Sequence, residues 1–475
     1  MQPFRLSLRK CLLAFAFMVL LAHCLSSFAQ NKPLLPPDSA SKIDEIVKNV
    51  LSATGVPSAS LAMVKDGKTV YTQSYGDARL NPKTPAKPEM RYSIGSISKQ
   101  FTAAAILILQ EQGKLSLDDK VSKWVPGLTR GDEVSIRQLL SHTSGYQDYA
   151  PQDYMIPDWE KPISAQQIMD RWAKIPLDFD PGTKWQYSNT NYVIAGVIVE
   201  KAAGRSLFDY LQERVLTPLA MTSATNTDLK KLPPSDPAGY FRYALGPLRL
   251  APKEGPGWMF AAGELAMTAE DVAKWDISLI NQSVLTPASY REMETEVVLK
   301  NGLGTRYGLG ISVLSENGHR WLEHSGEVSG FTAENIELPD DGFAVVVLTN
   351  QDAVGAGSQI GHGVVSWFVK SQNAQDTKQD ALVRGVFDAL KQGKIDRSLL
   401  TDNANSYFTE QALKDYSASL SPLGDPQSFM QSSRSLRGGM VHFSYQVKYP
   451  KKTLRINIYQ MPAGKFEQYL ISATE

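Results

Sequence analysis

The sequence predicts an α+β fold in which helices flank an antiparallel sheet, a helical lobe is inserted into the chain, and a small α+β domain follows at the C-terminus. Three observations predict this fold. A hairpin pattern lies around residue 66, helical patterns fill much of residues 115–280, and strand patterns return between residues 307 and 348. Because the two groups of strands are far apart in sequence, we expect distant segments to close the sheet.

The first 29 residues have the features of a secretory signal peptide. Three basic residues precede an apolar run, Cys11–Leu21, and small residues lead to Ala29. The apolar run is shorter than the roughly twenty residues that span a membrane. We therefore expect a secreted or periplasmic protein, with membrane contact only if this segment is retained or is lipidated at Cys24.

Composition narrows the possible chemistry. The only cysteines are Cys11 and Cys24, so cleavage after Ala29 would leave neither a disulfide framework nor a thiol nucleophile. The formal charge is zero, which does not favour a nucleic-acid partner. The six histidines are scattered without metal-ligand spacing, so we expect neither a metal nor another cofactor.

Residues 30–372 are expected to form the larger domain, which begins with a surface helix and a hairpin. Residues 38–51 carry apolar side chains at helical spacing, typical of an amphipathic helix. Two strand patterns, 58–64 and 69–72, flank Lys65-Asp66-Gly67, whose Asp-Gly pair favours a tight reversal. Residues 98–112 are apolar on nearly every side and should form a buried helix.

The inserted lobe, at about 115–280, should be mainly helical, and the sheet should resume after it. Helical patterns lie at 165–173, 192–203 and 269–280. Strand patterns follow at 307–314, 320–324, 332–338 and 343–348. The aromatic-rich segment 146–172 is a candidate wall or lid for a site.

A polar stretch at 370–380 predicts a linker, after which residues 376–475 should form a small α+β accessory domain. Helical patterns there precede strand patterns near 440–447, 453–459 and 466–472. The sequence assigns this domain no role.

Ser96 and Lys99 stand one helical turn apart at the start of the apolar helix, so both side chains project on the same side. A serine hydroxyl is a poor nucleophile until a base takes its proton, and a buried lysine can be neutral enough to act as that base. The helix N-terminus would add backbone N–H groups facing a developing oxyanion. The pairing predicts a nucleophile, Ser96, activated by Lys99.

The same spacing occurs at Ser39 and Lys42, so the four-residue pattern alone is not specific. Ser39 precedes a helix with a solvated face, where capping is the expected role. Lys99 lies in an apolar helix, where an unpaired ammonium would be costly and therefore needs a partner. We assign the chemistry to Ser96 and Lys99.

A second element is Tyr187-Ser188-Asn189, the only Tyr-x-Asn in the chain. A phenol near an ammonium can ionise more readily and could relay protons between Ser96 and a leaving group. The amide of Asn189 can hold a lysine or bind a substrate carbonyl. Taken alone, Tyr187 would more often be a core or surface residue.

A third element is His324-Ser325-Gly326, at the end of a predicted strand and followed by Glu327. A polar triplet on a strand edge, with glycine allowing close backbone approach, could align a substrate in an extended pose. A lone histidine is more often structural, and this is the role that we expect of His142.

These three elements, in this order, resemble the penicillin-recognising serine hydrolases, in the branch of class C β-lactamases, D-alanyl-D-alanine carboxypeptidases, D-aminopeptidases and related esterases. The resemblance covers roughly residues 38–369. Further landmarks are Ile136–Gly145, Pro181–Tyr192 and Tyr307–Gly310. It implies a β-lactamase/transpeptidase-like fold and a serine hydrolase, with a D-alanyl peptidase or carboxylesterase as the favoured activity.

The resemblance also implies roles for single residues. Ser96 would attack an amide or ester carbonyl and form an acyl-enzyme, while Lys99 and Tyr187 share general-base and general-acid duties. The implied substrate-binding residues are Asn189, His324, Ser325, Gly326 and Glu327. The backbone N–H groups of Ser96 and Glu327 would form an oxyanion hole. Which of Lys99 and Tyr187 takes the proton stays open.

One departure is informative, since β-lactamases of this branch generally carry lysine where this chain has His324. Histidine is charged only in part near neutral pH, so we expect inefficient β-lactam hydrolysis, although acylation by penicillin remains possible. The expected substrate is a small molecule or a peptide, with peptidoglycan-derived compounds among the candidates. The alternative is a catalytically idle relative that binds cell-wall peptide or a protein partner.

Overall fold

The computed structural model describes residues 35–474 except 37, 153, 317 and 373. The expected signal peptide, with Cys11 and Cys24, lies outside the described residues. The chain divides into two compact units, each described separately below. The first comprises the described residues up to Leu314 with Arg320–His362, and the second comprises Ser315–His319 and the described residues from Gly363 onward.

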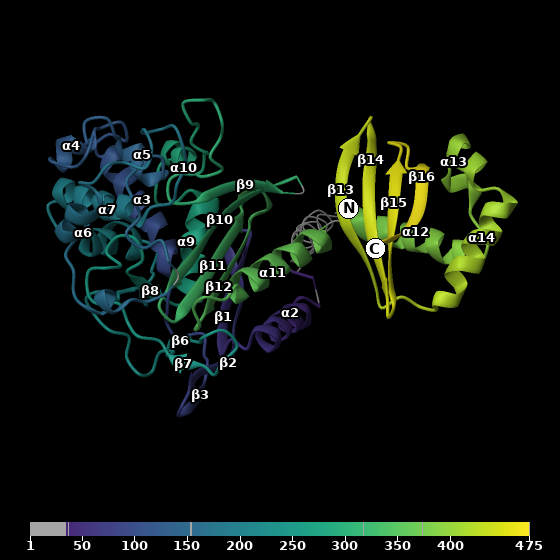
Figure 1. The fold of residues 1–475 in the computed structure, drawn as a ribbon, viewed down its shortest axis with the longest axis horizontal. Helices are drawn as coiled ribbons and strands as arrows, with labels where there is room; N and C mark the ends of the chain where they lie inside the picture. Colours follow the sequence, from purple (N-terminus) through teal and green to yellow (C-terminus); the bar gives the residue numbers. More distant parts are fainter. Residues whose placement is uncertain (1–34, 37, 153, 317, 373, 475) are drawn as a thin grey trace, which may run out of the picture. The chain divides into compact units, whose positions relative to one another are not determined.

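The first unit is built on a seven-stranded sheet (Figure 1). In spatial order its strands are β3 (Lys83–Pro85), β2 (Lys68–Leu80), β1 (Ser58–Lys65), β12 (Phe343–Thr349), β11 (Phe331–Leu338), β10 (His319–Val328) and β9 (Ser312–Glu316). The N-terminal strand β1 pairs antiparallel with β12, with Leu61 opposite Val347. The prediction that distant segments close an antiparallel sheet is therefore confirmed.

Helices cover both faces of this sheet. Figure 1 shows α2 (Ser39–Thr54) and α11 (Ala356–Gln372) along one face and α9 (Ala269–Asn281) along the other, while α3 (Ser98–Glu111) lies among the helices of the lobe. Seven of the eight residues of β1 are buried, as expected for a strand covered on both sides. The expected helical spans 38–51, 98–112 and 269–280 are confirmed to within three residues at each end.

Helices are the main regular elements of the inserted lobe, as predicted. They are α4 (Val121–Trp124), α5 (Ile136–Leu140), α6 (Ala165–Trp172), α7 (Asn189–Ala203) and α8 (Leu207–Leu211), and α10 (Pro287–Met293) follows after the lobe. Helix α3 packs against α7. Twelve of the fourteen residues of α3 are buried, including Lys99, so the buried-helix prediction is confirmed.

The prediction of a strand over 307–314 is wrong for residues 307–311, because β9 begins only at Ser312. Gly310 adopts φ +79°, and an added Cβ on Gly308 would lie 2.1 Å from the carbonyl oxygen of Met293. Both glycines therefore serve a tight turn in place of a strand. This turn leaves Tyr307 buried.

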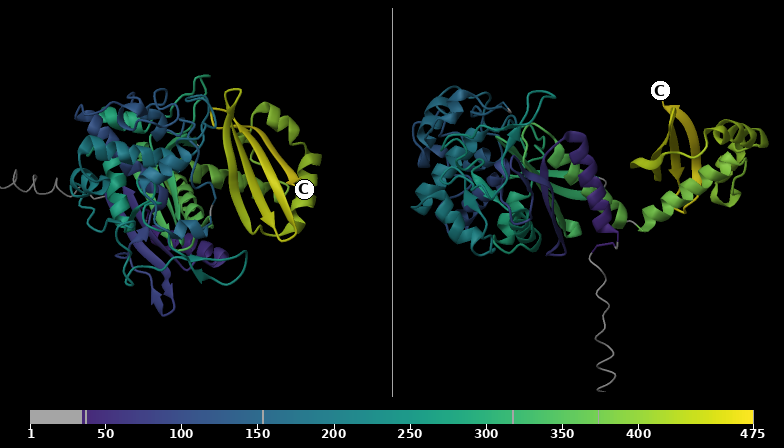
Figure 2. Two further views of the ribbon diagram at one scale, coloured as in Figure 1. Left: turned by 60° about the vertical axis from the view of Figure 1, so that its left-hand side comes forward. Right: turned by 90° about the horizontal axis from the view of Figure 1, so that it is seen from below.

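The second unit contains α12 (Ala374–Lys391), α13 (Asp402–Tyr407), α14 (Glu410–Leu420) and a four-stranded antiparallel sheet (Figure 2). Its strands, in spatial order, are β13 (Ser428–Arg437), β14 (Met440–Tyr449), β15 (Lys452–Gln460) and β16 (Phe466–Thr474). The three predicted strands correspond to β14–β16. The polar composition of β13 gave it no strand signal. The polar stretch predicted as a linker forms the last turn of α11 and the first turns of α12.

Within the described residues, no helix combines the length and the apolar character that crossing a membrane requires.

Candidate active site

Ser96 lies in a single turn of 3₁₀ helix, Gly95–Ile97, that leads directly into α3. Gly95 adopts φ +52°, a left-handed conformation that suits glycine at this reversal. Lys99 follows one turn later and is completely buried. At the competing motif, the side chain of Lys42 is 50% exposed and pairs with Glu45. The structure thus separates the two Ser-x-x-Lys sequences as expected.

Lys99 Nζ has three hydrogen-bond acceptors around it. They are Ser96 Oγ at 2.9 Å, Asn189 Oδ1 at 2.7 Å and the carbonyl oxygen of Ala262 at 2.9 Å. Burial lowers the pKa of Lys99 to about 7, and the charge of Asp148 acts in the opposite direction. At neutral pH the amine therefore spends a large share of its time unprotonated, with its lone pair available to the Ser96 hydroxyl.

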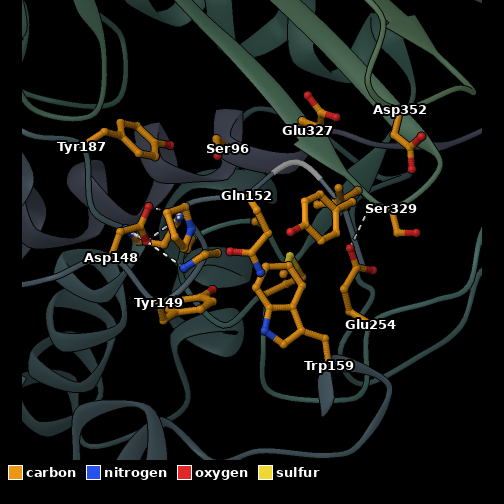
Figure 3. Close-up of a pocket in the computed structure, with 18 of the residues that line it drawn as sticks. Ser96, Asp148, Tyr149, Gln152, Trp159, Tyr187, Glu254, Glu327, Ser329 and Asp352 are labelled. Carbon is orange, nitrogen blue, oxygen red and sulfur yellow. Dashed lines mark hydrogen bonds between the residues drawn. The ribbon is translucent and has the colours of Figure 1, made fainter. Parts of the chain in front are cut away.

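Tyr187 lies beside both residues, and its ring centroid is 5.0 Å from Lys99 Nζ. Figure 3 shows the Tyr187 ring directed toward Ser96. Burial raises the pKa of Tyr187, and a hydrogen bond with Ser96 only partly offsets this rise. The expectation that the phenol ionises readily is therefore wrong, because burial removes the solvation that a phenolate needs.

Asn189 begins α7 and joins Lys99 to a carboxylate that the sequence analysis missed. Its backbone nitrogen donates to Asp148 Oδ1 at 2.9 Å. Its side-chain nitrogen lies 3.1 Å and 3.3 Å from the two oxygens of the same carboxylate. The amide is thereby held on both sides, by Lys99 and by Asp148.

His142 contacts the segment that carries Tyr187 and Asn189. Its Nδ1 accepts the backbone N–H of Ser188 at 3.1 Å, and its ring centroid lies 4.2 Å from that of Tyr187. Burial lowers the pKa of His142 well below its ordinary value, so the ring is neutral. The structural role expected of His142 agrees with these contacts.

His324 on β10 is buried and neutral. Its Nε2 lies 2.8 Å from the Tyr307 hydroxyl, and its Nδ1 lies 2.6 Å from the carbonyl oxygen of Ser325. Burial, with a smaller contribution from the charge of Lys99, lowers the pKa of His324 to about 4. The expectation of a partly charged histidine is therefore wrong, and the site has no cation at this position.

Gly326 and Gly95 let two backbone segments meet next to Ser96. An added Cβ on Gly326 would lie 1.9 Å from the carbonyl oxygen of Ile94 and 3.2 Å from the Ser96 nitrogen. One on Gly95 would lie 2.6 Å from the Glu327 nitrogen. Only glycines permit this approach, which brings the two amide groups expected to form the oxyanion hole close together.

These residues border a pocket of about 760 Å³ (Figure 3). Six of the predicted site residues line it: Ser96, Tyr187, Asn189, His324, Ser325 and Glu327. Lys99 and Gly326 are buried and are not among the lining residues. Tyr149, Tyr154 and Trp159 also line it, so the aromatic segment forms part of the wall as expected. Figure 3 shows Glu254 and Asp352 across the pocket from Tyr187 and Asp148.

Three contributors to the site were not predicted: Asp148, Tyr307 and the carbonyl of Ala262. Asp148 lies close after the Ser-His-Thr-Ser-Gly landmark, and Tyr307 opens the Tyr-Gly-Leu-Gly landmark, so both had a weak signal. A backbone carbonyl carries no side-chain signal, and only the folded chain brings Ala262 to Lys99.

An antiparallel sheet flanked by helices, with a serine in the turn that leads into a buried helix and a lysine in the first turn of that helix, defines the β-lactamase/transpeptidase class of fold. The chain belongs to the β-lactamase family, since the family model described as Beta-lactamase matches residues 43–360.

Individual relatives agree with this assignment. Penicillin-binding protein 4* of Bacillus subtilis (strain 168) is 30% identical over 301 residues, which are 60% of this chain and 66% of that protein. The chain thus spans just under two thirds of the length of this relative. A D-stereospecific amidohydrolase from Streptomyces sp. has a similar structure, with a TM-score of 0.61 and 27% identity, covering 71% of this chain and 99% of that chain.

A likeness of fold alone extends to the D-amino acid amidase from Ochrobactrum anthropi SV3 in complex with D-phenylalanine. This structure has a TM-score of 0.64 and 24% identity, and the match covers 71% of this chain and 100% of that chain.

Proposed function

We propose that this protein is a serine hydrolase that cleaves amide or ester bonds through an acyl-enzyme on Ser96. The observation that carries the proposal is the 2.9 Å contact between Lys99 Nζ and Ser96 Oγ at a buried lysine. Burial lowers the pKa of this lysine to about 7, so a neutral amine faces the hydroxyl. The similarity to a penicillin-binding protein and to a D-stereospecific amidohydrolase supports the same class.

In the proposed first step, neutral Lys99 takes the Ser96 proton while Oγ forms a bond to the substrate carbonyl carbon. The resulting ammonium has acceptors for all three of its N–H groups. Tyr187 keeps its proton because burial raises its pKa. It can therefore donate a proton to the leaving nitrogen or oxygen and be reprotonated by Lys99 as that bond breaks. Water then hydrolyses the ester on Ser96 by the reverse sequence.

Negative charge on the carbonyl oxygen would be stabilised by the backbone N–H groups of Ser96 and Glu327. The close approach of Gly95 and Gly326 supports this role, because it brings the two segments together. Preorganised donors of this kind typically contribute about 3 kcal/mol each to the transition state.

The chain contains its own matched control for a test of the nucleophile. The protein would be treated with a fluorescent fluorophosphonate and with a fluorescent penicillin. We expect covalent label on the parent protein and on Ser39→Ala, but none on Ser96→Ala. An unlabelled parent protein would support the idle, binding-only alternative, and label that persists in Ser96→Ala would place the nucleophile elsewhere.

The charge of the pocket favours substrates without a terminal carboxylate. Among the described lining residues are four carboxylates, of Asp148, Glu254, Glu327 and Asp352, but no lysine or arginine. Glu254 accepts the backbone N–H of Ser329 at 2.7 Å, and Asp352 accepts that of Gly330 at 2.8 Å. Burial raises the pKa of both, so each negative charge is poorly solvated and would gain from a nearby cation.

We therefore propose amides or esters of amino acids with a free amino group as the preferred substrates, ahead of D-alanyl-D-alanine peptides. The test compares D-alanine p-nitroanilide with its N-acetyl derivative and with an N-acyl-D-Ala-D-Ala peptide. We expect the highest kcat/KM for the free amine and a smaller difference between the two anilides in Glu254→Gln. A preference for the peptide would overturn this assignment of substrate but not that of the nucleophile.

A further inference from the structure

We propose that Asp148 is a positioning residue of this site: its carboxylate fixes the orientation of the Asn189 amide and supplies the negative charge that stabilises the Lys99 ammonium. The inference rests on the proposed function, because it concerns the lysine that would activate Ser96. Neither the family match nor the relatives' names assign a role to this residue.

The orientation of Asn189 follows from the chemistry of its two neighbours. An ammonium can only donate hydrogen bonds, and a carboxylate can only accept them. The amide oxygen therefore faces Lys99 Nζ at 2.7 Å, and the amide nitrogen faces Asp148 at 3.1 Å. The opposite orientation would set donor against donor and acceptor against acceptor.

Asp148 holds more than the side chain of Asn189. Its Oδ1 also accepts the backbone N–H of Asn189 at 2.9 Å and that of Ala150 at 3.1 Å. These bonds tie the first residue of α7 to the loop that follows His142. The position of the amide oxygen next to Lys99 is thus fixed through both the backbone and the side chain of Asn189.

Asp148 is also the negative charge that acts on Lys99. The other titratable groups around the amine are Tyr187 and Tyr192, whose ring centroids lie 5.0 and 5.5 Å from Nζ, and the rings of His142 and His324. Burial raises the pKa of both tyrosines and lowers that of both histidines, so all four are neutral near pH 7. Asp148 alone among these described groups raises the pKa of Lys99.

Two opposing effects therefore set the pKa of Lys99 to about 7. Burial lowers the pKa of Lys99, and the negative charge of Asp148 raises it again in part. Without Asp148 the amine would be neutral over a wider pH range but less basic. Such an amine would be a weaker acceptor for the Ser96 proton, and it would hold that proton less tightly after acylation.

The titration of Lys99 can be measured directly by NMR of protein labelled with [¹³Cε]lysine, using Lys99→Arg to assign the signal. We expect an inflection near pH 7 in the parent protein, and one lower by roughly one pH unit in Asp148→Asn, because an opposite charge nearby is removed. An unchanged inflection in Asp148→Asn would overturn the proposal. Since this measurement needs no turnover, its failure is distinct from the absence of label on Ser96.

A second pair of variants separates the charge of Asp148 from its hydrogen bonds. Asp148→Asn keeps an acceptor for the Asn189 amide, whereas Asp148→Ala removes it. Above pH 8, we expect fluorophosphonate to label Asp148→Ala about tenfold more slowly than Asp148→Asn, because misplaced groups react more slowly. Equal rates in these two variants would overturn the positioning role.

The matched control is Asp271→Asn, at a buried aspartate that accepts the Ser223 backbone N–H at 2.7 Å on another part of the lobe. This variant should leave the Lys99 inflection unchanged. An equal shift in Asp271→Asn would show that Asp148→Asn acts only through a general loosening of the fold, and would also overturn the proposal.

Discussion

The Tyr307 hydroxyl lies 2.8 Å from Nε2 of His324, and the carbonyl oxygen of Ser325 lies 2.6 Å from Nδ1 of the same ring. A carbonyl can only accept, so Nδ1 carries the proton and Nε2 accepts from the phenol. The imidazole is thus satisfied in its neutral form. A position where related β-lactamases are expected to carry a lysine cation is uncharged in this protein.

A cation at this position should change substrate preference. In His324→Lys, we expect the ratio of kcat/KM for nitrocefin to that for an uncharged p-nitrophenyl ester to rise about tenfold, because a hydrogen bond to a charged group is worth about 1.5 kcal/mol or more. His324→Gln is the neutral control and should leave the ratio low. Rapid nitrocefin hydrolysis by the parent protein would contradict the reasoning from His324.

Acylation should depend on pH through Lys99. The active form is the neutral amine, and burial lowers the pKa of Lys99 to about 7. The rate of covalent labelling of Ser96 should therefore fall about tenfold per pH unit below 7 and level off above it. Labelling with fluorophosphonate between pH 5 and 9 measures this profile. A flat rate across that range would exclude Lys99 as the base.

The close approach of Gly326 to the Ser96 turn should be indispensable. In Gly326→Ala the new Cβ would lie 1.9 Å from the carbonyl oxygen of Ile94, so the backbone beside Ser96 must move. We expect labelling of Ser96 to slow by at least about 100-fold, since small displacements of reacting groups are costly. Gly357→Ala in α11 is the control, because its Cβ would meet nothing closer than 3.6 Å. Parent-like labelling of Gly326→Ala would show that the turn tolerates the shift.

Stability should also depend on pH, through a buried carboxyl pair remote in sequence from Ser96. Asn335 Nδ2 donates to Asp276 at 2.8 Å and to Glu337 at 3.0 Å, and burial raises the pKa of both carboxyls. The folded state keeps a proton that the unfolded chain releases above pH 4 or so, so the free energy of unfolding falls as pH rises from there toward neutrality.

Asp276→Asn should remove much of this dependence. We expect its melting temperature, measured between pH 4 and 8, to fall less with rising pH than that of the parent protein. Glu337→Gln should behave in the same way, because either amide removes one of the two competing carboxyls. Parallel curves for parent and variants would show that the pair does not share a proton.

Much of the fold and of the reactive centre follows from local sequence. The spacing of Ser96 and Lys99 places both on one side of a helix wherever that helix lies, because helix geometry fixes the three-residue separation. The Asp-Gly reversal likewise predicted the β1–β2 hairpin, whose strands pair antiparallel with Leu61 opposite Gln73. Strand β13 could not be found in this way, because its polar residues carry no alternating pattern.

The sequence by itself determined which hydroxyl and which amine stand together, and that the lysine beside Ser96 is buried. Only the tertiary structure decided the charges around them. Asp148 and Tyr307 reach the site from loops, and their distances depend on how the lobe and the sheet pack. Protonation states follow from desolvation, which no local pattern encodes. Burial therefore favours the neutral forms of Tyr187 and His324, where the sequence had suggested charge.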